Sequence, residues 1–526
     1  MADEQSWTDR VDEGVNSVFG PVSDFLGDIV FYTVDIAGTS FPLIVGWLVV
    51  AGIVFSAYFG LAQVRHLRTA FRLVRGKYEQ KDAPGEVTHF QALSSAVSGT
   101  VGLGNIAGVA IAISIGGPGA TFWMILCGLL GMATKFVECT LGVKYREVHA
   151  DGTVSGGPMH YLRKGLAERG LPQVGKVLAA LSAVMILFFT FFGGNLFQVN
   201  QSLEQLASVT EDHTGFFAGS AGALFYGVVV AALVALVLLG GIRSIGKVTS
   251  RLVPSMAIMY VAACLLVILF NVTEVPAAVS TIISGAFNPE GVAGGLIGAL
   301  IIGFQRAAFS NEAGIGSAPI AHAAVKTKRP ATEGLVAMIE PFIDTVVICT
   351  ITALTIVIAS GPLYLETREA AAAGESVGGT TMGISITSDA FSTALPWFPA
   401  LLTIAVILFA FSTLITWSYY GLKAWSHLFG ASRTSETIYK VFFSAIVVMG
   451  ALVSLDTLVG LSDSALFLAA LFNIIGLYFL APVVKKELVK VLEYIRRRDA
   501  GESDEEIDAS EAAAEGGPEG KVGVTK

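Results

Sequence analysis

The 526-residue chain is 53% hydrophobic, and only 14% of its residues carry a charge. Soluble domains have about 25% charged residues. This composition, with a mean hydropathy of +0.68, therefore excludes a soluble globular protein and predicts an all-α protein that crosses a membrane many times. The formal net charge of −9 comes mostly from tails and loops. We expect the lipid bilayer as partner, no nucleic acid and no obligate protein partner.

A bilayer core requires about 20 mostly apolar residues per helix, and eleven segments of the chain meet this requirement. In chain order they are 41–62, 90–114, 118–142, 177–201, 219–240, 252–271, 292–317, 333–360, 394–420, 436–454 and 462–483. Residues 1–40 form a polar to amphipathic lead-in, and 41–62 is an extra N-terminal helix. Residues 484–526 combine a basic helix with an acidic low-complexity tail that we expect to be disordered.

The distribution of lysine and arginine predicts the orientation of these segments. Basic residues favour the cytoplasmic side. They gather in alternate connections: 63–89, 143–176, 241–251, 318–332, 421–440 and 484–498. The connections on the other side contain only Arg10 and Arg368. We therefore predict a multi-pass protein of the cell membrane, with the N-terminus outside and the C-terminus in the cytoplasm.

Two of the eleven segments contain residues that would break a helix. The first reads "SGTVGLGNIAGVAIA" from Ser98 to Ala112, and the second reads "GFQRAAFSNEAGIGSAP" from Gly303 to Pro319. Glycine destabilises a helix interior by about 1 kcal/mol relative to alanine. The two breaks lie five segments apart, so the last ten segments divide into two sets, 90–271 and 292–483. The sets have opposite orientation, and each begins with a broken helix. This pattern is the best sequence pointer to the binding site of a secondary transporter.

A break in mid-membrane exposes backbone groups that a ligand can satisfy. Irregular backbone is tolerated there only where it is buried in protein or lines a cavity. Free N–H groups suit a carboxylate, free carbonyls suit sodium or an ammonium group, and Asn105 adds a side-chain oxygen. The alternative is ordinary helix packing, since small-xxx-small patterns such as Gly104 to Gly108 are common at membrane helix contacts. The second break favours the binding site.

Several blocks of the sequence resemble the alanine/glycine:cation symporter family. That resemblance implies a LeuT-type fold, in which a 5+5 inverted repeat follows one extra N-terminal helix. It also implies transport of small neutral amino acids, chiefly alanine and glycine, with sodium as the coupling ion. Many members have threonine where this chain has Leu103, which removes a possible hydroxyl ligand. The blocks are "FQALSSAVSGTVGLGNIAGVA" (90–110), "GGPGATFWMILCGLLGMATKFVE" (116–138), "SGGPMHYL" (155–162), "FSNEAGIGSAPIAHAA" (309–324), "EPFIDTVVICTITAL" (340–354) and "FSTLITWSYYG" (411–421).

The resemblance also implies two sets of site residues. The substrate set is Gly102, Gly104, Asn105, Gln198, Gly303, Phe304, Thr413 and Trp417. The sodium set is Thr100, Asn105, Ser310, Asp344, Ser412 and Thr413. The unwound part of the second broken helix is expected near 303–310, facing the ammonium group. Each role has a structural alternative: an interhelical hydrogen bond for Gln198, ordinary packing or an interfacial position for Trp417, and bonding to carbonyls of their own helix for Ser412 and Thr413.

Charged residues inside the segments are rare, and such residues are functional by default. Lys135 and Glu138 are three residues apart and are interpreted as a structural pair or as part of an inner gate. Asp344 either helps to balance a bound cation or pairs with Arg306. Glu312 is assigned to a polar network in the inner half of the protein.

The sequence therefore predicts a sodium-coupled symporter of alanine, glycine or a similarly small amino acid, working by alternating access. It predicts no organic cofactor and no enzymatic activity, because the chain has no phosphate-binding lysine loop, zinc motif or nucleophile elbow. One alternative is a proton-coupled carrier of another small zwitterion on the same fold. An ion channel is the alternative from another class, and it would require a continuous polar pore.

Overall fold

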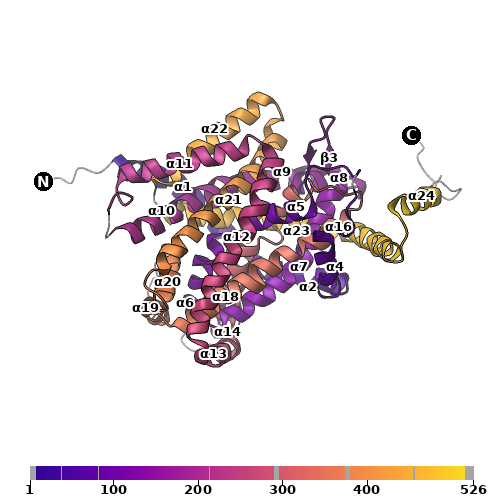
Figure 1. Cartoon of the computed structure of the whole chain (residues 1–526). Helices are drawn as coiled ribbons and strands as arrows, with labels where there is room; N and C mark the ends of the chain where they lie inside the picture. Colours follow the sequence, from indigo (N-terminus) through magenta and orange to yellow (C-terminus); the bar gives the residue numbers. More distant parts are fainter. Residues whose placement is uncertain are drawn as a thin grey trace.

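In a computed structural model the chain folds into a bundle of long helices with two small β-hairpins (Figure 1). The structure describes residues 7–36, 38–80, 82–211, 214–288, 295–373, 380–453 and 456–515. The ends of the predicted lead-in and tail, 1–6 and 516–526, lie outside the described residues.

The N-terminal part of the chain leads into the first broken helix. Its elements are α1 (Trp7–Val30), β1 (Thr33–Ile36), β2 (Thr39–Pro42), α2 (Leu43–Tyr58), α3 (Ala62–Arg65), α4 (Leu67–Val74), α5 (His89–Thr100), η1 (Leu103–Asn105) and α6 (Ala107–Ile115). The remaining elements before the second broken helix are α7 (Ala120–Lys144), β3 (Glu147–Val148), β4 (Val154–Ser155), α8 (Pro158–Glu168), α9 (Pro172–Phe191), η2 (Phe192–Leu196), α10 (Phe197–Thr210), α11 (Ser220–Leu238), α12 (Gly241–Phe270), η3 (Val272–Glu274) and α13 (Val275–Phe287).

The second half of the chain begins with the other broken helix. It comprises α14 (Gly295–Asn311), α15 (Ala318–His322), α16 (Pro330–Ala337), α17 (Ile339–Pro341), η4 (Phe342–Cys349), α18 (Thr350–Ala359), α19 (Pro362–Ala372), α20 (Thr380–Ser392), α21 (Phe398–Phe429), α22 (Arg433–Gly450), α23 (Asp456–Asp499) and α24 (Asp504–Glu515). The strands β1 and β2 pair antiparallel, with Thr33 opposite Pro42, and β3 and β4 pair antiparallel in the same way.

The helices confirm a multi-pass membrane protein. Among the described residues, seven helical segments are long and apolar enough to cross a bilayer, or up to eight if the bent α5–α6 pair is one span. All eleven predicted segments contain helix, but three of these helices do not reach that standard. α2 and α14 are short, with 16 and 17 residues, and α22 carries Arg433, Glu436 and Lys440. The count of eleven spans stays a prediction.

The first broken helix lies where the glycines predicted it. α5 begins at a capping box in which the Thr88 side chain accepts from the Gln91 N–H and the Gln91 side chain accepts from the Thr88 N–H. It ends at Thr100, and the following helical segment is bent by 61° relative to it. The Asn105 side-chain oxygen accepts a hydrogen bond of 2.9 Å from the Gly102 N–H. The predicted asparagine therefore stabilises the break itself.

The second break is real, but its predicted position is wrong. Residues 303–310 are helical, because α14 continues to Asn311, and the unwound segment is 312–317. Glu312, Gly314 and Gly316 have positive φ values of 53°, 96° and 89°. Glycine adopts this conformation without a steric penalty. The last two glycines of the motif therefore define the break, whereas Gly303 lies within the helix.

Among the described residues, helices form in the amphipathic lead-in and in part of the acidic tail. α1 is an amphipathic helix that packs against α23. In the tail, residues 504–515 form α24, which follows the end of α23 in Figure 1. Ile507 on this helix is completely buried. The prediction of a disordered tail is therefore wrong for 504–515, because long-range contacts that local composition does not encode hold the helix in place.

Candidate functional site

Three residues predicted to bind substrate converge at the first break. A Cβ atom built on Gly102 would lie 3.0 Å from Thr413 Oγ1 and 3.7 Å from Gln198 Oε1. These side chains come from α21 and α10, and both residues are buried. The absence of a side chain at residue 102 therefore leaves a small polar space between backbone, hydroxyl and amide.

Among the described residues, two buried polar atoms of the predicted substrate set have no hydrogen-bond partner: Gln198 Oε1, which borders this space, and Trp417 Nε1. The Gln198 amide nitrogen is fixed, because it donates to the Gly193 carbonyl at 3.1 Å, so its oxygen is left to accept. Buried polar groups are normally hydrogen-bonded, and leaving one unpaired costs about 1–3 kcal/mol. An acceptor and a donor without partners are what a polar ligand would satisfy.

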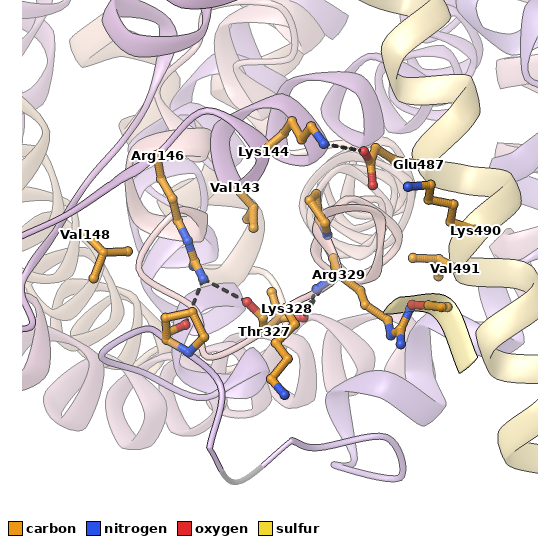
Figure 2. Close-up of a pocket in the computed structure, with 13 residues that line it drawn as sticks. Val143, Lys144, Arg146, Val148, Thr327, Lys328, Arg329, Glu487, Lys490 and Val491 are labelled. Atoms are coloured by element: carbon orange, nitrogen blue, oxygen red, sulfur yellow. Dashed lines mark hydrogen bonds and ion pairs between the residues drawn. The ribbon is translucent and has the colours of Figure 1, made fainter. Parts of the chain in front are cut away.

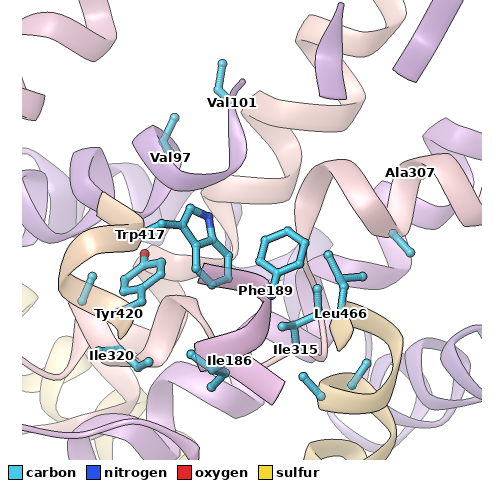
Figure 3. Close-up of a cluster of buried hydrophobic side chains, with 14 of the residues drawn as sticks. Val97, Val101, Ile186, Phe189, Ala307, Ile315, Ile320, Trp417, Tyr420 and Leu466 are labelled. Atoms are coloured by element: carbon cyan, nitrogen blue, oxygen red, sulfur yellow. The ribbon is translucent and has the colours of Figure 1, made fainter. Parts of the chain in front are cut away.

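Aromatic side chains form the wall of the same region. The Trp417 ring lies 4.5 Å from the Phe189 ring and 5.2 Å from the Tyr420 ring, centroid to centroid. Figure 3 shows these three rings in one cluster of buried side chains that also contains Val97 and Val101 of the first broken helix. A Cβ on Gly194 would approach Trp417 Cγ to 2.6 Å, so this glycine in η2 is what allows the indole to lie there.

The second broken helix meets the first one at Gly104. A Cβ on Gly104 would lie 3.6 Å from both Phe309 Cδ1 and Ser310 Cα. Phe309 also lies 6.2 Å from the Phe189 ring. Phe309 and Phe189 were not predicted as site residues, and an isolated phenylalanine in an apolar segment gives no signal that could have identified them.

Three of the predicted sodium ligands form one buried cluster. Asp344 Oδ1 accepts from the Asn105 amide at 2.7 Å, and Asp344 Oδ2 accepts from the Ser310 hydroxyl at 2.8 Å. Thr345, which the sequence did not indicate, donates to the same oxygen at 2.7 Å. All four side chains are buried. These donors are neutral, so the hydrogen bonds do not balance the charge of an ionised carboxylate.

Ser412 and Thr413 lie beside α5, the first part of the first broken helix. Thr413 Oγ1 is 3.1 Å from the Ser98 carbonyl oxygen, and the Ser98 hydroxyl donates to the Ser412 carbonyl at 2.7 Å. Ser412 Oγ also donates within its own helix, to the Phe409 carbonyl. This location places hydroxyl and carbonyl oxygens together, as the sodium prediction requires. The Thr100 hydroxyl is 3.4 Å from the carbonyls of Ala96 and Val97 in its own helix.

Two predicted substrate residues lie elsewhere. Gly303 packs on α7, where a Cβ would meet the Ala120 carbonyl oxygen at 2.6 Å. Phe304 is also buried against α7, with its ring 6.4 Å from that of Trp123. The structure does not bring this pair together with Gly102, because 303–310 is helical and directs these positions towards α7.

A buried charge network joins α7, α17 and the second break, and its pairing differs from the prediction. Lys135 bonds to Glu340 at 3.0 Å, whereas Glu138 accepts from the Gly314 N–H and from Asn473. The predicted Arg306–Asp344 alternative is also not supported, because Arg306 interacts electrostatically with Asp463 instead. Glu312 accepts a hydrogen bond of 2.6 Å from Ser317.

The sequence matches known transporters over most of its length. The model of the sodium:alanine symporter family matches residues 24–509. The chain is 38% identical over 460 residues to the sodium/alanine symporter AgcS of Methanococcus maripaludis, covering 87% of this chain and 96% of that protein. It is 33% identical to the amino-acid carrier protein AlsT of Bacillus subtilis (92% and 93% covered) and 31% identical to that organism's probable sodium/glutamine symporter GlnT (87% and 89% covered).

The fold is also found in a solved transporter. The crystal structure of MhsT in complex with L-phenylalanine aligns with a TM-score of 0.53 at 15% identity, covering 78% of this chain and 99% of that chain. A likeness at this identity concerns the fold alone. It confirms the LeuT-type architecture that the sequence predicted.

Proposed function

Because the chain belongs to the sodium:alanine symporter family, we propose that it couples inward sodium movement to the uptake of alanine and similarly small neutral amino acids, glycine included. The observation that carries the proposal is the convergence of Gly102, Thr413 and the unpartnered Gln198 Oε1 at the first break. A small zwitterion would satisfy that oxygen, and the aromatic wall would limit the size of its side chain.

The zwitterion would be oriented by the charge preferences of the surrounding groups. The backbone between Gly102 and Asn105 turns there, and its N–H groups suit the substrate carboxylate. Gln198 Oε1 is an acceptor and suits the ammonium group. Trp417, with its ring held by Phe189, would face the amino-acid side chain. Gly303 and Phe304 have no place in this site.

Two groups of oxygen atoms are candidates for sodium, which is carried together with the substrate. One is the cluster of Asn105, Ser310 and Asp344, where the ion would balance a buried carboxylate. The other is formed by Ser412, Thr413 and the Ser98 carbonyl. Alternating access would open these sites to each side in turn by movement of one helix group against the other.

The proton-coupled alternative concerns the same carboxylate. A buried carboxylate without a cationic partner is costly in free energy, and a proton removes that cost as well as a sodium ion does. A substitution of Asp344 should therefore distinguish sodium coupling from proton coupling. Enclosure of the site by buried side chains favours a carrier over a channel, which needs a continuous polar path.

Equilibrium binding of radiolabelled alanine to the purified protein tests the proposal. We expect binding in sodium buffer that is lost in choline buffer, with glycine competing for the site. Gln198→Leu should weaken binding, because the buried acceptor is removed. Glutamine is the informative second competitor, because a relative is named for it. Alanine binding that is equal in sodium and choline would contradict the coupling.

A further inference from the structure

A cavity of about 520 Å³, whose lining contains none of the candidate substrate residues, lies between the end of α7 and the C-terminal part of α23 (Figure 2). Its lining contains five cationic side chains, Lys144, Arg146, Lys328, Arg329 and Lys490, but only two carboxylates, Glu487 and Glu511. This volume falls within the range of small-molecule sites, about 300–1,000 Å³. The excess of positive charge indicates an anion.

Arg146 and the backbone carbonyls that it binds form one wall of the cavity. The Arg146 guanidinium donates to the carbonyls of Ala323, Val325, Pro84 and Thr327 at 2.6–2.8 Å. Burial lowers the pKa of Arg146 to about 10, so the group remains charged at neutral pH. The wall fixes the connection between α15 and α16, which follows the second broken helix. A ligand in the cavity would contact that connection.

Arg329 is a second buried cation in the lining of the cavity. Its side chain is only 8% exposed, and its guanidinium lies 4.0 Å over the Tyr494 ring. Two of its nitrogens donate to Glu511 and Asp508 at 2.9 Å, while its buried Nε–H has no partner among the described residues. Arginine forks bind phosphate as they bind carboxylate. Arg329 therefore keeps a donor that its present partners do not satisfy.

Glu487 of α23 pairs with Lys144 at 2.7 Å, whereas the carboxylates that neutralise Lys328 and Arg329 belong to the tail helix. Asp508 bonds to both Lys328 and Arg329, and Glu511 lines the cavity itself. Both residues lie on α24, which is joined to α23 by a short turn and anchored by buried Ile507. The tail helix thus holds the carboxylates of Asp508 and Glu511 against Lys328 and Arg329.

We propose that this cavity binds a phosphate-bearing anion, and that Asp508 and Glu511 of α24 compete with that anion for Lys328 and Arg329. The position at the ends of two membrane-spanning helices fits the headgroup of an anionic lipid, and a soluble phosphate has the same chemistry. Binding of either would release the tail helix from Arg329. The proposal does not depend on the identity of the transported substrate.

The full chain, purified in a neutral detergent, allows both sources to be tested. One arm measures equilibrium binding of radiolabelled inorganic phosphate, and the other measures retention of phosphatidylglycerol against phosphatidylcholine by native mass spectrometry. The double substitution Asp508→Asn, Glu511→Gln should raise the affinity roughly five- to tenfold, since it removes the competing ion pairs. Lys328→Gln should lower it severalfold without endangering the fold, because that side chain is 46% exposed.

Arg496→Gln is the matched control, because Arg496 is 77% exposed and pairs with Glu493 on its own helix. The affinity of this variant for phosphate and for phosphatidylglycerol should equal that of the unaltered protein. Binding of phosphate alone would identify a soluble ligand, and selective retention of phosphatidylglycerol would identify a lipid site. Failure of both probes to bind the double variant, or binding that Lys328→Gln and Arg496→Gln change equally, would overturn the proposal.

Discussion

Gly102→Ala tests the proposed substrate site at the point where the structure is most restrictive. The new Cβ would lie 3.0 Å from Thr413 Oγ1 and 3.7 Å from Gln198 Oε1, so it would occupy the polar space itself. The φ of Gly102 is −149°, which is negative, and the Thr413 hydroxyl can move by a few tenths of an ångström. The variant should therefore fold and insert.

The expected loss is one hydrogen bond to a charged substrate group, which contributes about 1.5–3 kcal/mol. That value corresponds to alanine binding weakened roughly 10- to 150-fold. The assay is radiolabelled alanine uptake into proteoliposomes over a range of alanine concentrations, with the amount of inserted protein measured in parallel.

Gly108→Ala is the control in the same broken helix. A Cβ at Gly108 would have no heavy atom within 4 Å, so its uptake should match that of the unaltered protein. If Gly102→Ala transports with unchanged affinity, or if both variants lose activity equally, the glycines serve helix packing and the site is elsewhere.

Three further predictions concern the aromatic wall, the buried carboxylate and the orientation of the chain. Trp417→Phe should let methionine or leucine compete with alanine about fourfold better for each methylene accommodated, at about 0.8 kcal/mol each; an unchanged competition profile would assign Trp417 to packing. Asp344→Asn should raise the sodium concentration for half-maximal uptake at least about tenfold, because it removes the buried charge that a cation would balance; loss of pH dependence with unchanged sodium dependence would favour the proton. Finally, a membrane-impermeant thiol reagent applied to intact cells should label Ser17→Cys but not Glu505→Cys, and external labelling of Glu505→Cys would refute the predicted orientation.

The sequence was most informative where particular residue types determine the backbone conformation. The glycines around Gly102 and the nearby Asn105 predicted a broken helix, and the structure has the break there because the Asn105 side chain bonds to the Gly102 backbone. The second break was placed too early in its motif. The predicted stretch 303–310 contains a single glycine, whereas Gly314 and Gly316, with positive φ values, lie in the unwound segment 312–317.

The tail shows what local composition cannot encode. Residues 504–515 read as an acidic, low-complexity segment, yet they fold as α24 against Arg329. That arginine is far away in sequence, and its buried charge requires a carboxylate. Ile507 is the one apolar anchor within the acidic run, and nothing in its neighbours indicates that it is buried.

Pairings between side chains of different helices also could not be predicted from the sequence. Lys135 is three residues from Glu138 on the same helix, but it bonds to Glu340 on another element. Phe309 entered the site because the two broken helices meet at Gly104. Such contacts depend on how helices are rotated and placed, which spacing along one segment does not determine.

The coupling of alanine to sodium is the central claim, and accumulation measured in proteoliposomes tests it most directly. One sodium ion moving across 100 mV and down a tenfold gradient releases about 3.7 kcal/mol, which supports roughly 500-fold accumulation of a neutral substrate. We predict concentrative, electrogenic alanine uptake that disappears when the sodium gradient is collapsed at constant pH. Accumulation that survives this collapse and disappears with a proton ionophore would contradict the claim.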